Sequence, residues 1–147
     1  MQLRADFDAI ANWVTPNSSL LDLGCGDGSF LDFIRTKRHV KTYGVEIMDA
    51  SVLACIKKGL NVIQQDLEGG LALFEDQSFD TVVLSQTLQT IHQTERILRE
   101  VVRVGEQCVV PSQTLAIGPI ALQWPSAECL YRSLCRMSGL IRRTFGF

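Results

Sequence analysis

The sequence predicts an α/β domain with a doubly wound, mostly parallel sheet. Short apolar segments alternate with segments of helical periodicity over residues 1–110, and strands that alternate with helices pair in parallel through right-handed crossovers. A glycine-rich turn, Gly24 to Gly28, follows the first of these apolar segments. Sheets of this kind bind ligands beyond the carboxyl ends of their strands, so the residues that end each expected strand are candidate site residues.

The expected elements run as one helix followed by alternating strands and helices. Each strand is a short apolar run, and each helix repeats apolar residues three or four positions apart. The first helix places Phe7, Ile10 and Trp13 on one face, while Asp49 and Gly59 are the expected N-cap and end of the third. The expected strands are 20–24, 41–47, 60–66, 80–85 and 106–110; the expected helices are 6–14, 29–37, 49–59 and 88–104, with a loop and one helical turn within 68–79.

Composition indicates one compact, soluble domain. The chain has 147 residues, 46% of them hydrophobic, and its net charge of −2 and pI near 5.6 make nucleic acid an unexpected partner. Asp6 and Asp8 stand where a secretion signal needs a basic segment and an apolar run, so we expect a cytoplasmic protein without a membrane partner. The five cysteines form no C-x-x-C pair, and therefore neither a metal site nor a disulfide framework is expected.

The segment "DLGCGDG" ends the first expected strand. The absence of β-carbons at Gly24, Gly26 and Gly28 lets the backbone turn sharply and approach a ligand closely. The dinucleotide fingerprint requires glycine where Ser29 stands, and Asp22 would repel a pyrophosphate, so an NAD-binding module is disfavoured. Asp22 can instead bind a cation or, through water, the charged amino-acid part of a nucleoside-linked amino acid. This pattern resembles the first motif of class I S-adenosylmethionine (SAM) dependent methyltransferases, which implies their Rossmann-like fold.

Acids end the next two expected strands. Glu46 lies about 20 residues beyond the glycine turn, where a carboxylate can accept both hydroxyl groups of a ribose. Asp66 ends the third strand, where the methyltransferase resemblance implies a contact with the adenine amine and places Leu67 beside the ring. Ile47 completes the cofactor-binding candidates on these strands. A solvated cap is the alternative for each acid taken alone, but their joint order along the chain favours a site for SAM or S-adenosylhomocysteine.

The exit of the fourth expected strand supplies no strong base. Ser85, Gln86 and Thr87 stand where the methyltransferase resemblance implies residues beside the methyl group, and Ser85 is taken as a cofactor-binding candidate. His92 is expected to be a surface or core histidine. Cys25, inside the glycine turn, is expected to pack or to contact the cofactor, because no base is nearby in sequence to activate a nucleophile. The catalytic residue is therefore unknown, although methyl transfer by positioning alone is possible.

Longer strings resemble one particular family. "LLDLGCGDGSFLDFIRTKRHVKTYGVEI", "GLNVIQQDLEGGLALFEDQSFDTVVLSQTLQ" and "ILREVVRVG" are similar to the MetW family of methionine-biosynthesis proteins, from about Asp6 to Val110. The resemblance implies a SAM-binding domain that acts in methionine synthesis with homoserine O-acyltransferase. Two hypotheses follow: an accessory protein that supports homoserine acylation and senses SAM, or a methyltransferase acting on a small molecule.

The composition changes at residue 111. Residues 1–110 carry 10 Lys and Arg against 15 Asp and Glu, whereas residues 111–147 carry 4 against 1 and lack Val, Asp, Asn, His and Lys. The MetW-like continuations "FPNFGHWPYR" and "MPVSESLPYEWFDTPN" can be coded so that a shift of one base gives "SQTLAIGPIA" and most of "AECLYRSLCRMSGLIRRTFGF". We therefore interpret 1–110 as the methyltransferase-like domain and 111–147 as a frameshifted, non-native tail, arising from a single-base deletion in the gene or in its sequencing. The truncated sheet is expected to have an open edge after the fifth strand.

Overall fold

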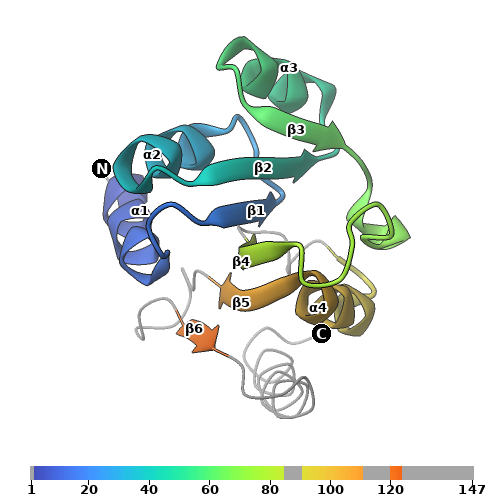
Figure 1. Cartoon of the computed structure of the whole chain (residues 1–147). Coiled ribbons are helices and arrows are strands. Elements are labelled where there is room, and N and C mark those ends of the chain that lie inside the picture. Colours follow the sequence, from blue (N-terminus) through green and yellow to red (C-terminus); the bar gives the residue numbers. More distant parts are fainter. Residues whose placement is uncertain (1, 85–90, 111–119, 124–147) are drawn as a thin grey trace.

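The computed structural model describes residues 2–84, 91–110 and 120–123, and in them the expected α/β fold is confirmed (Figure 1). The sheet order is β3-β2-β1-β4-β5-β6, in which the first five strands are parallel and the sixth is antiparallel. The strands are β1 (Ser19–Leu23), β2 (Lys41–Glu46), β3 (Asn61–Gln64), β4 (Phe79–Leu84), β5 (Gly105–Val110) and β6 (Ile120–Gln123). The helices are α1 (Gln2–Trp13), α2 (Ser29–Arg38), α3 (Asp49–Lys57), the 3-10 turn η1 (Leu67–Gly69) and α4 (Thr94–Val104).

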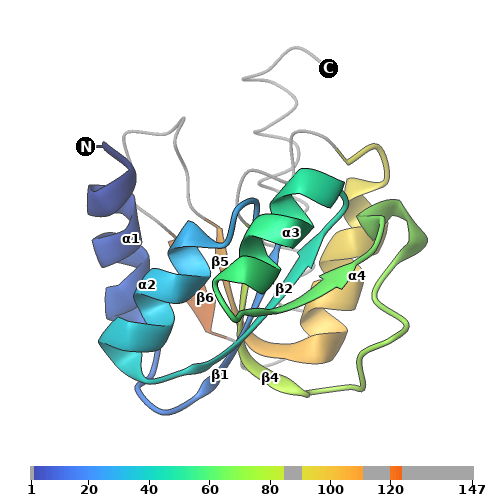
Figure 2. The same cartoon turned by 90° about the horizontal axis from the view of Figure 1, so that it is seen from above.

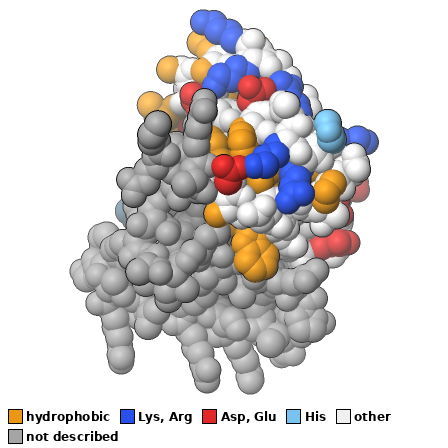
Figure 3. All heavy atoms as spheres, turned by 90° about the vertical axis from the view of Figure 1, so that its left-hand side faces the viewer, with side chains coloured by type: hydrophobic (Ala, Val, Ile, Leu, Met, Phe, Trp, Pro, Cys, Tyr) orange, Lys and Arg blue, Asp and Glu red, His pale blue; other side chains and the backbone are white. Residues whose placement is uncertain are grey.

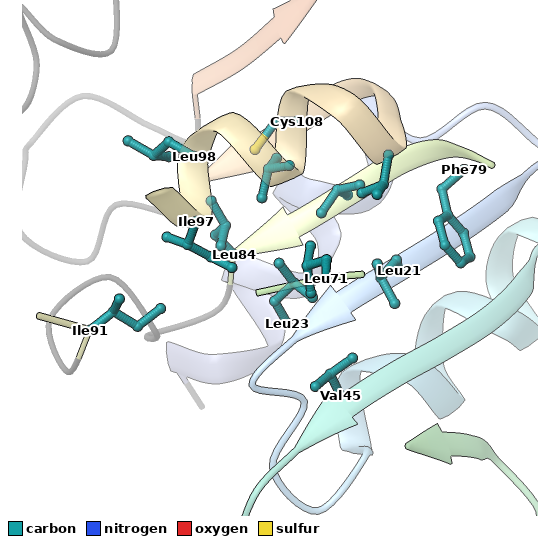
Figure 4. Packing of buried hydrophobic residues seen from close by; sticks show 13 residues of the cluster. Leu21, Leu23, Val45, Leu71, Phe79, Leu84, Ile91, Ile97, Leu98 and Cys108 are labelled. Atoms are coloured by element: carbon teal, nitrogen blue, oxygen red, sulfur yellow. The ribbon is translucent and has the colours of Figure 1, made fainter. Parts of the chain in front are cut away.

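Helices cover both faces of the sheet (Figure 2). On one face, apolar residues of α1, α2 and α3 pack on β1, β4 and β5. On the other face, Ile97, Leu98 and Val101 of α4 pack with Leu71 against the opposite side chains of the same strands. Figure 4 shows this second layer, with Leu23 among its labelled residues. Each fully buried side chain of this size stabilises the fold by about 1.5–3 kcal/mol, so the two layers fix the sheet from both sides.

The edge of the sheet beyond β5 differs from the expectation. An open edge was expected there, but Gln107 to Val110 pair antiparallel with Gln123 to Ile120 of β6. The expectation was wrong because an edge strand presents unpaired N–H and C=O groups. These groups can form hydrogen bonds with the backbone of an extended segment without requiring a particular side-chain pattern. The sequence pattern of residues 111–147 carried no alternation that marked a strand.

Three local expectations are also corrected. Trp13, expected on the apolar face of the first helix with Phe7 and Ile10, is 49% exposed. The N-cap of α3 is Met48, which has extended backbone angles and makes no side-chain cap, while Asp49 is already helical and accepts a hydrogen bond from Gln64 instead. The fourth helix was expected from residue 88, but Ile91 to Gln93 are not helical and α4 begins at Thr94; residues 85–90 lie outside the described residues.

Arg103 ties the segment after η1 to α4. Its guanidinium donates to the Leu71 and Phe74 carbonyls at 3.0 and 2.8 Å, to Asp76 at 2.8 Å and to Glu100 at 2.9 Å. Glu100 in turn accepts the backbone N–H of Leu71 at 3.1 Å. The hydrogen bond from Arg103, followed by the one from Leu71, lowers the pKa of Glu100 against the opposing effect of burial. These hydrogen bonds anchor the loop that follows η1, the turn next to Asp66, to α4.

Replacing Glu100 with glutamine is expected to lower the free energy of unfolding at pH 7 by about 1–2 kcal/mol, because it weakens the charge-assisted hydrogen bonds to Arg103. The native pKa of Glu100 lies below its ordinary value of 4.5, so this stabilisation is complete above that pH and is lost as the pH falls through the lowered value. Urea unfolding at pH 7 and at about pH 3 should therefore show a difference that shrinks in acid. Glu106→Gln, on an exposed side chain, is the control; an equal effect of both variants would contradict the prediction.

Large apolar side chains are exposed directly after β2 and along α3. Among the described residues with large apolar side chains, Ile47, Met48, Leu53 and Ile56 are each more than half exposed. Figure 3 shows apolar and basic side chains at the top of the molecule, the end at which α3 lies in Figure 1. Of the described helices, none combines the length and apolar character that a membrane span requires. Ile47 and Met48 adjoin the candidate site described next.

Candidate functional site

The parallel register brings the predicted strand ends to one edge of the sheet. Leu23 at the end of β1 pairs with Val45 of β2 and with Leu84 at the end of β4. Glu46 at the end of β2 pairs with Gln64 at the end of β3. The glycine turn and the two following strand ends are therefore neighbours, as the alternation of strands and helices predicted.

The glycine turn has one packed side and one open side. Gly24, Gly26 and Gly28 have φ angles of 77°, 56° and 77°, which residues other than glycine rarely adopt. A β-carbon on Gly28 would lie 2.5 Å from Leu60 Cδ1 and 2.8 Å from Cys55 Sγ, whereas one on Gly26 would meet nothing within 4 Å. The turn is thus pressed against α3 at Gly28 and leaves room for a ligand at Gly26.

Glu46 joins the glycine turn to the end of β2. Its Oε2 accepts the N–H of Gly26 at 2.8 Å, across 20 positions of sequence. Its Oε1 accepts the N–H groups of Ile47 and Met48 at 2.9 and 3.1 Å, while the Val45 carbonyl accepts the N–H of Gly24 at 2.8 Å. The carboxylate therefore lies beside the open part of the turn, held there by three backbone donors.

Asp66 lies beyond the end of β3. It caps η1, because its Oδ1 accepts the N–H of Glu68 at 2.9 Å. The neighbouring Gln65 N–H donates to the Glu46 carbonyl at 3.0 Å, which brings this segment to the end of β2. Leu67 is partly buried against the α4 side of the core. Asp66 thus has the capping role that was the alternative for it, and its exposed carboxylate also borders the strand ends.

The remaining predicted residues differ in exposure. Asp22 is 1% exposed, between Gly44 of β2 and Val83 of β4. Ile47 is 53% exposed beside Glu46. Ser85 lies outside the described residues. In the part of the chain that the structure describes, no group of three or more His, Cys, Asp or Glu side chains is arranged to hold a metal ion.

Comparison with known proteins assigns the chain to a family. The family model described as "Methionine biosynthesis protein MetW" matches residues 4–119. The chain belongs to the MetW family. The bifunctional methionine biosynthesis protein MetXA/MetW of Rhodopirellula baltica is 35% identical over 116 residues, which are 74% of this MetW chain and 19% of that protein. A phthiotriol/phenolphthiotriol dimycocerosates methyltransferase of Mycobacterium tuberculosis is 30% identical over 90 residues, 58% of the chain and 33% of that protein. The chain thus spans a third or less of the length of these two relatives.

Solved structures share the fold of the MetW chain. A SAM-dependent methyltransferase from Archaeoglobus fulgidus superposes with a TM-score of 0.67 at 22% identity, covering 77% of the chain and 53% of that structure. A SAM-dependent methyltransferase from Thermotoga maritima, a possible histamine N-methyltransferase, gives a TM-score of 0.60 at 24% identity, covering 73% of the chain and 49% of that structure. The Rossmann-like methyltransferase fold expected from the sequence is confirmed.

Two residues beside the glycine turn were not predicted from the sequence. Cys55 Sγ donates to the Gly26 carbonyl at 3.2 Å, and Lys58 Nζ donates to the Asp27 carbonyl at 2.7 Å. Their spacing of three places them on one face of α3 and its C-terminal cap, but no pattern in the sequence tells that this face lies against the glycine turn. Only the fold brings them together.

Cys25 lies in the packed side of the turn. Its Sγ is 3.9 Å from Cys55 Sγ, and a β-carbon on Gly44 would come within 2.6 Å of it. Burial, and after it the negative charge of Asp22, raises the pKa of Cys25, while burial raises the pKa of Cys55. Both thiols are protonated at neutral pH and are poor nucleophiles. This agrees with a packing role for Cys25.

Proposed function

We propose that this MetW-family chain binds SAM or S-adenosylhomocysteine at the glycine turn and acts in methionine biosynthesis as an accessory protein to homoserine O-acyltransferase. The observation that carries the proposal is the hydrogen bond from Gly26 N–H to Glu46 Oε2, at 2.8 Å. It sets a carboxylate, which can accept ribose hydroxyl groups, beside backbone that a ligand can approach closely. The proposal retains the cytoplasmic location expected from the sequence.

The residues present fit such a nucleoside. The open space at Gly26 admits the ligand against the backbone, and a carboxylate has about four acceptor positions, of which the three N–H groups at Glu46 use three. One hydroxyl group of a ribose would donate to the free acceptor position of the Glu46 carboxylate. The second would share, or replace, one of the three backbone N–H donors. Exposed Ile47 offers an apolar surface to a base. Asp66 and Leu67 are assigned to the adenine.

The remaining assignments concern the far end of the ligand. Gly24 and Gly28 shape the turn, and Cys25 packs beneath it. Asp22, the acid of the first motif, is assigned to the amino-acid end of the ligand through a bridging water. Asp22 is 1% exposed, so a direct contact with the ligand would require a local opening of the turn. Ser85 is assigned to the methyl edge.

The partnership with an acyltransferase is supported by the bifunctional methionine biosynthesis relative, whose name joins MetW to a second part, MetXA, in one chain. A second candidate is methyl transfer to a small molecule, which the 30% identical mycobacterial methyltransferase favours. The two candidates share the SAM site and differ in what approaches it. A protein partner is required by the first and a methyl acceptor by the second.

Three measurements on the full chain separate these candidates. Titration calorimetry with SAM and with S-adenosylhomocysteine tests the site, and saturable binding of either ligand is expected. Co-purification with homoserine O-acyltransferase, with and without SAM, tests the accessory role. An assay with methyl-labelled SAM tests group transfer. Absence of any nucleoside binding by the folded chain would remove both candidates, and label transfer without acyltransferase binding would favour the methyltransferase.

We further propose that residues 111–147 are a frameshifted continuation of the family sequence. The change of composition at residue 111 and the two MetW-like strings recovered by one shift support this. Reading the nucleotide sequence across codon 111 tests it. An intact alternative frame that does not continue as a MetW-like sequence would contradict the proposal.

A further inference from the structure

We propose that Lys58 is a positioning residue for the nucleoside site: with Cys55, it fixes the carbonyl groups of the glycine turn against α3 and so directs the intervening N–H group away from that helix. The inference rests on the proposed SAM binding. It adds to that function a residue that sets the conformation of the turn before a ligand arrives.

The Lys58 ammonium group has all of its donors matched. Its Nζ lies 2.7 Å from the Asp27 carbonyl, 3.3 Å from Asp27 Oδ2 and 3.2 Å from Ser29 Oγ. An ammonium has three donors, so three acceptors of the turn saturate it. The same three contacts join the end of α3 to the start of α2, on either side of the turn.

Asp27 is itself held in place. Its Oδ1 accepts the N–H of Ser29 at 3.0 Å and its Oδ2 accepts the Ser29 hydroxyl at 2.7 Å. These hydrogen bonds, and after them Lys58, lower the pKa of Asp27. The carboxylate is therefore ionised at neutral pH and available to Lys58, although an exposed ion pair alone contributes little. The contact with the backbone carbonyl is the one that bears on the conformation of the turn.

Cys55 holds the preceding carbonyl. Its Sγ is 3.2 Å from the oxygen of Gly26, so the carbonyls of Gly26 and Asp27, which are consecutive, both face α3. In a planar trans peptide the C=O and the next N–H point in opposite directions. Fixing the Gly26 carbonyl toward α3 thus directs the Asp27 N–H away from it.

This arrangement determines what the turn offers to a ligand. Within the part of the chain that is described, the N–H groups of Gly24, Cys25, Gly26 and Gly28 already donate to protein acceptors, whereas the Asp27 N–H donates to no described residue. A donor that is already oriented binds without the loss of freedom that ordering it would require. Cys55 fixes the peptide that carries the Asp27 N–H, and Lys58 fixes the next peptide, between Asp27 and Gly28, so the two contacts together limit rotation at Asp27. Removal of the Lys58 ammonium should therefore weaken binding more than it weakens folding.

The test compares Lys58→Met, which keeps the apolar stem, with Lys58→Arg, which restores a cation, and with Lys57→Met at the neighbouring exposed lysine. Calorimetry should show SAM affinity reduced about tenfold in Lys58→Met, within about threefold of wild type in Lys58→Arg, and unchanged in Lys57→Met. In amide NMR spectra of the ligand-free chain, the Asp27 and Gly28 resonances should move in Lys58→Met and remain in Lys57→Met.

The outcomes separate this inference from the proposed function. If the wild type binds no nucleoside, the proposed function fails while the amide spectra still report whether Lys58 sets the turn. If the wild type binds SAM and Lys58→Met binds it equally well with unmoved amide resonances, the role of Lys58 is refuted. Equal losses in Lys57→Met and Lys58→Met would indicate a general charge effect and refute it too. Should Lys58→Met not fold, Lys58→Gln, which keeps a donor, is measured by the same criteria.

Discussion

Replacing Gly28 with alanine is expected to lower the free energy of unfolding by about 2–5 kcal/mol, the sum of a left-handed backbone penalty and an overpacked contact. The φ angle of Gly28 is 77°, and the added β-carbon would lie 2.5 Å from Leu60 Cδ1 and 2.8 Å from Cys55 Sγ. Both neighbours belong to the packed layer under α2 and α3, so neither can move far without displacing others. Urea unfolding of the variant measures the loss.

Gly26→Ala is the matched control for Gly28→Ala. Its φ of 56° is also left-handed, but its β-carbon would meet no atom within 4 Å, so only the backbone penalty of about 1–2 kcal/mol is expected. The added methyl group points into the room assigned to the ligand, and SAM affinity should fall even though folding is nearly retained. Equal destabilisation by the two variants would show that the packed and open sides of the turn do not differ.

Replacing Glu46 with glutamine is expected to weaken SAM binding by about 10–100-fold, because hydrogen bonds from the ribose hydroxyls to a charged acceptor contribute about 1.5–3 kcal/mol. The amide nitrogen of glutamine would also face either the Gly26 N–H or the N–H groups of Ile47 and Met48, which now donate to the carboxylate. Because two N–H donors that face each other cannot form a hydrogen bond, the contact between the turn and the end of β2 is weakened. We therefore also expect a loss of folding stability, smaller than the loss of binding free energy.

Calorimetry and urea unfolding of the Glu46→Gln variant separate these two effects. Glu75→Gln is the control, since Glu75 is an exposed acid in the segment before β4, at the opposite end of the strands from Glu46. If both variants bind SAM as the wild type does, the assignment of Glu46 to the ribose is refuted. A loss of stability in Glu46→Gln without any loss of affinity would leave the acid a purely structural role.

The residues of the candidate site that could be predicted from the sequence lie at, or directly after, the ends of strands. The glycine turn follows β1 directly and Glu46 is the last residue of β2. Parallel pairing brings these strand ends to the same edge of the sheet, so their sequence order alone predicts that Gly26 and Glu46 are neighbours. Asp66 was placed at a strand end but lies two residues beyond it, because β3 stops at Gln64 and the chain turns into η1.

The features that escaped prediction depend on packing between distant elements. Cys55 and Lys58 are unremarkable in sequence, and only the seating of α3 on the turn makes them part of the site. Two other features were missed for different reasons. The start of α4 at Thr94 was missed because helical periodicity extends past the true boundary, and the pairing of β6 with β5 was missed because backbone pairing at a sheet edge needs no side-chain pattern. The extended backbone of Met48, too, is set by the hydrogen bonds of Glu46 rather than by local preference.

The order of the strands has a consequence for synthesis on the ribosome. The five parallel strands, and every described residue assigned to the nucleoside, are translated by residue 110, and of the strands that the structure describes only β6 comes later. Domains form as the chain emerges, amino-terminal segments first. The strands that carry the candidate site, β2, β1 and β4, are thus separated by β5 from β6, the last described strand to be translated. A change of reading frame after Val110 would alter the flank of the sheet beyond β5, whereas the strands of the candidate site precede the change and keep their sequence.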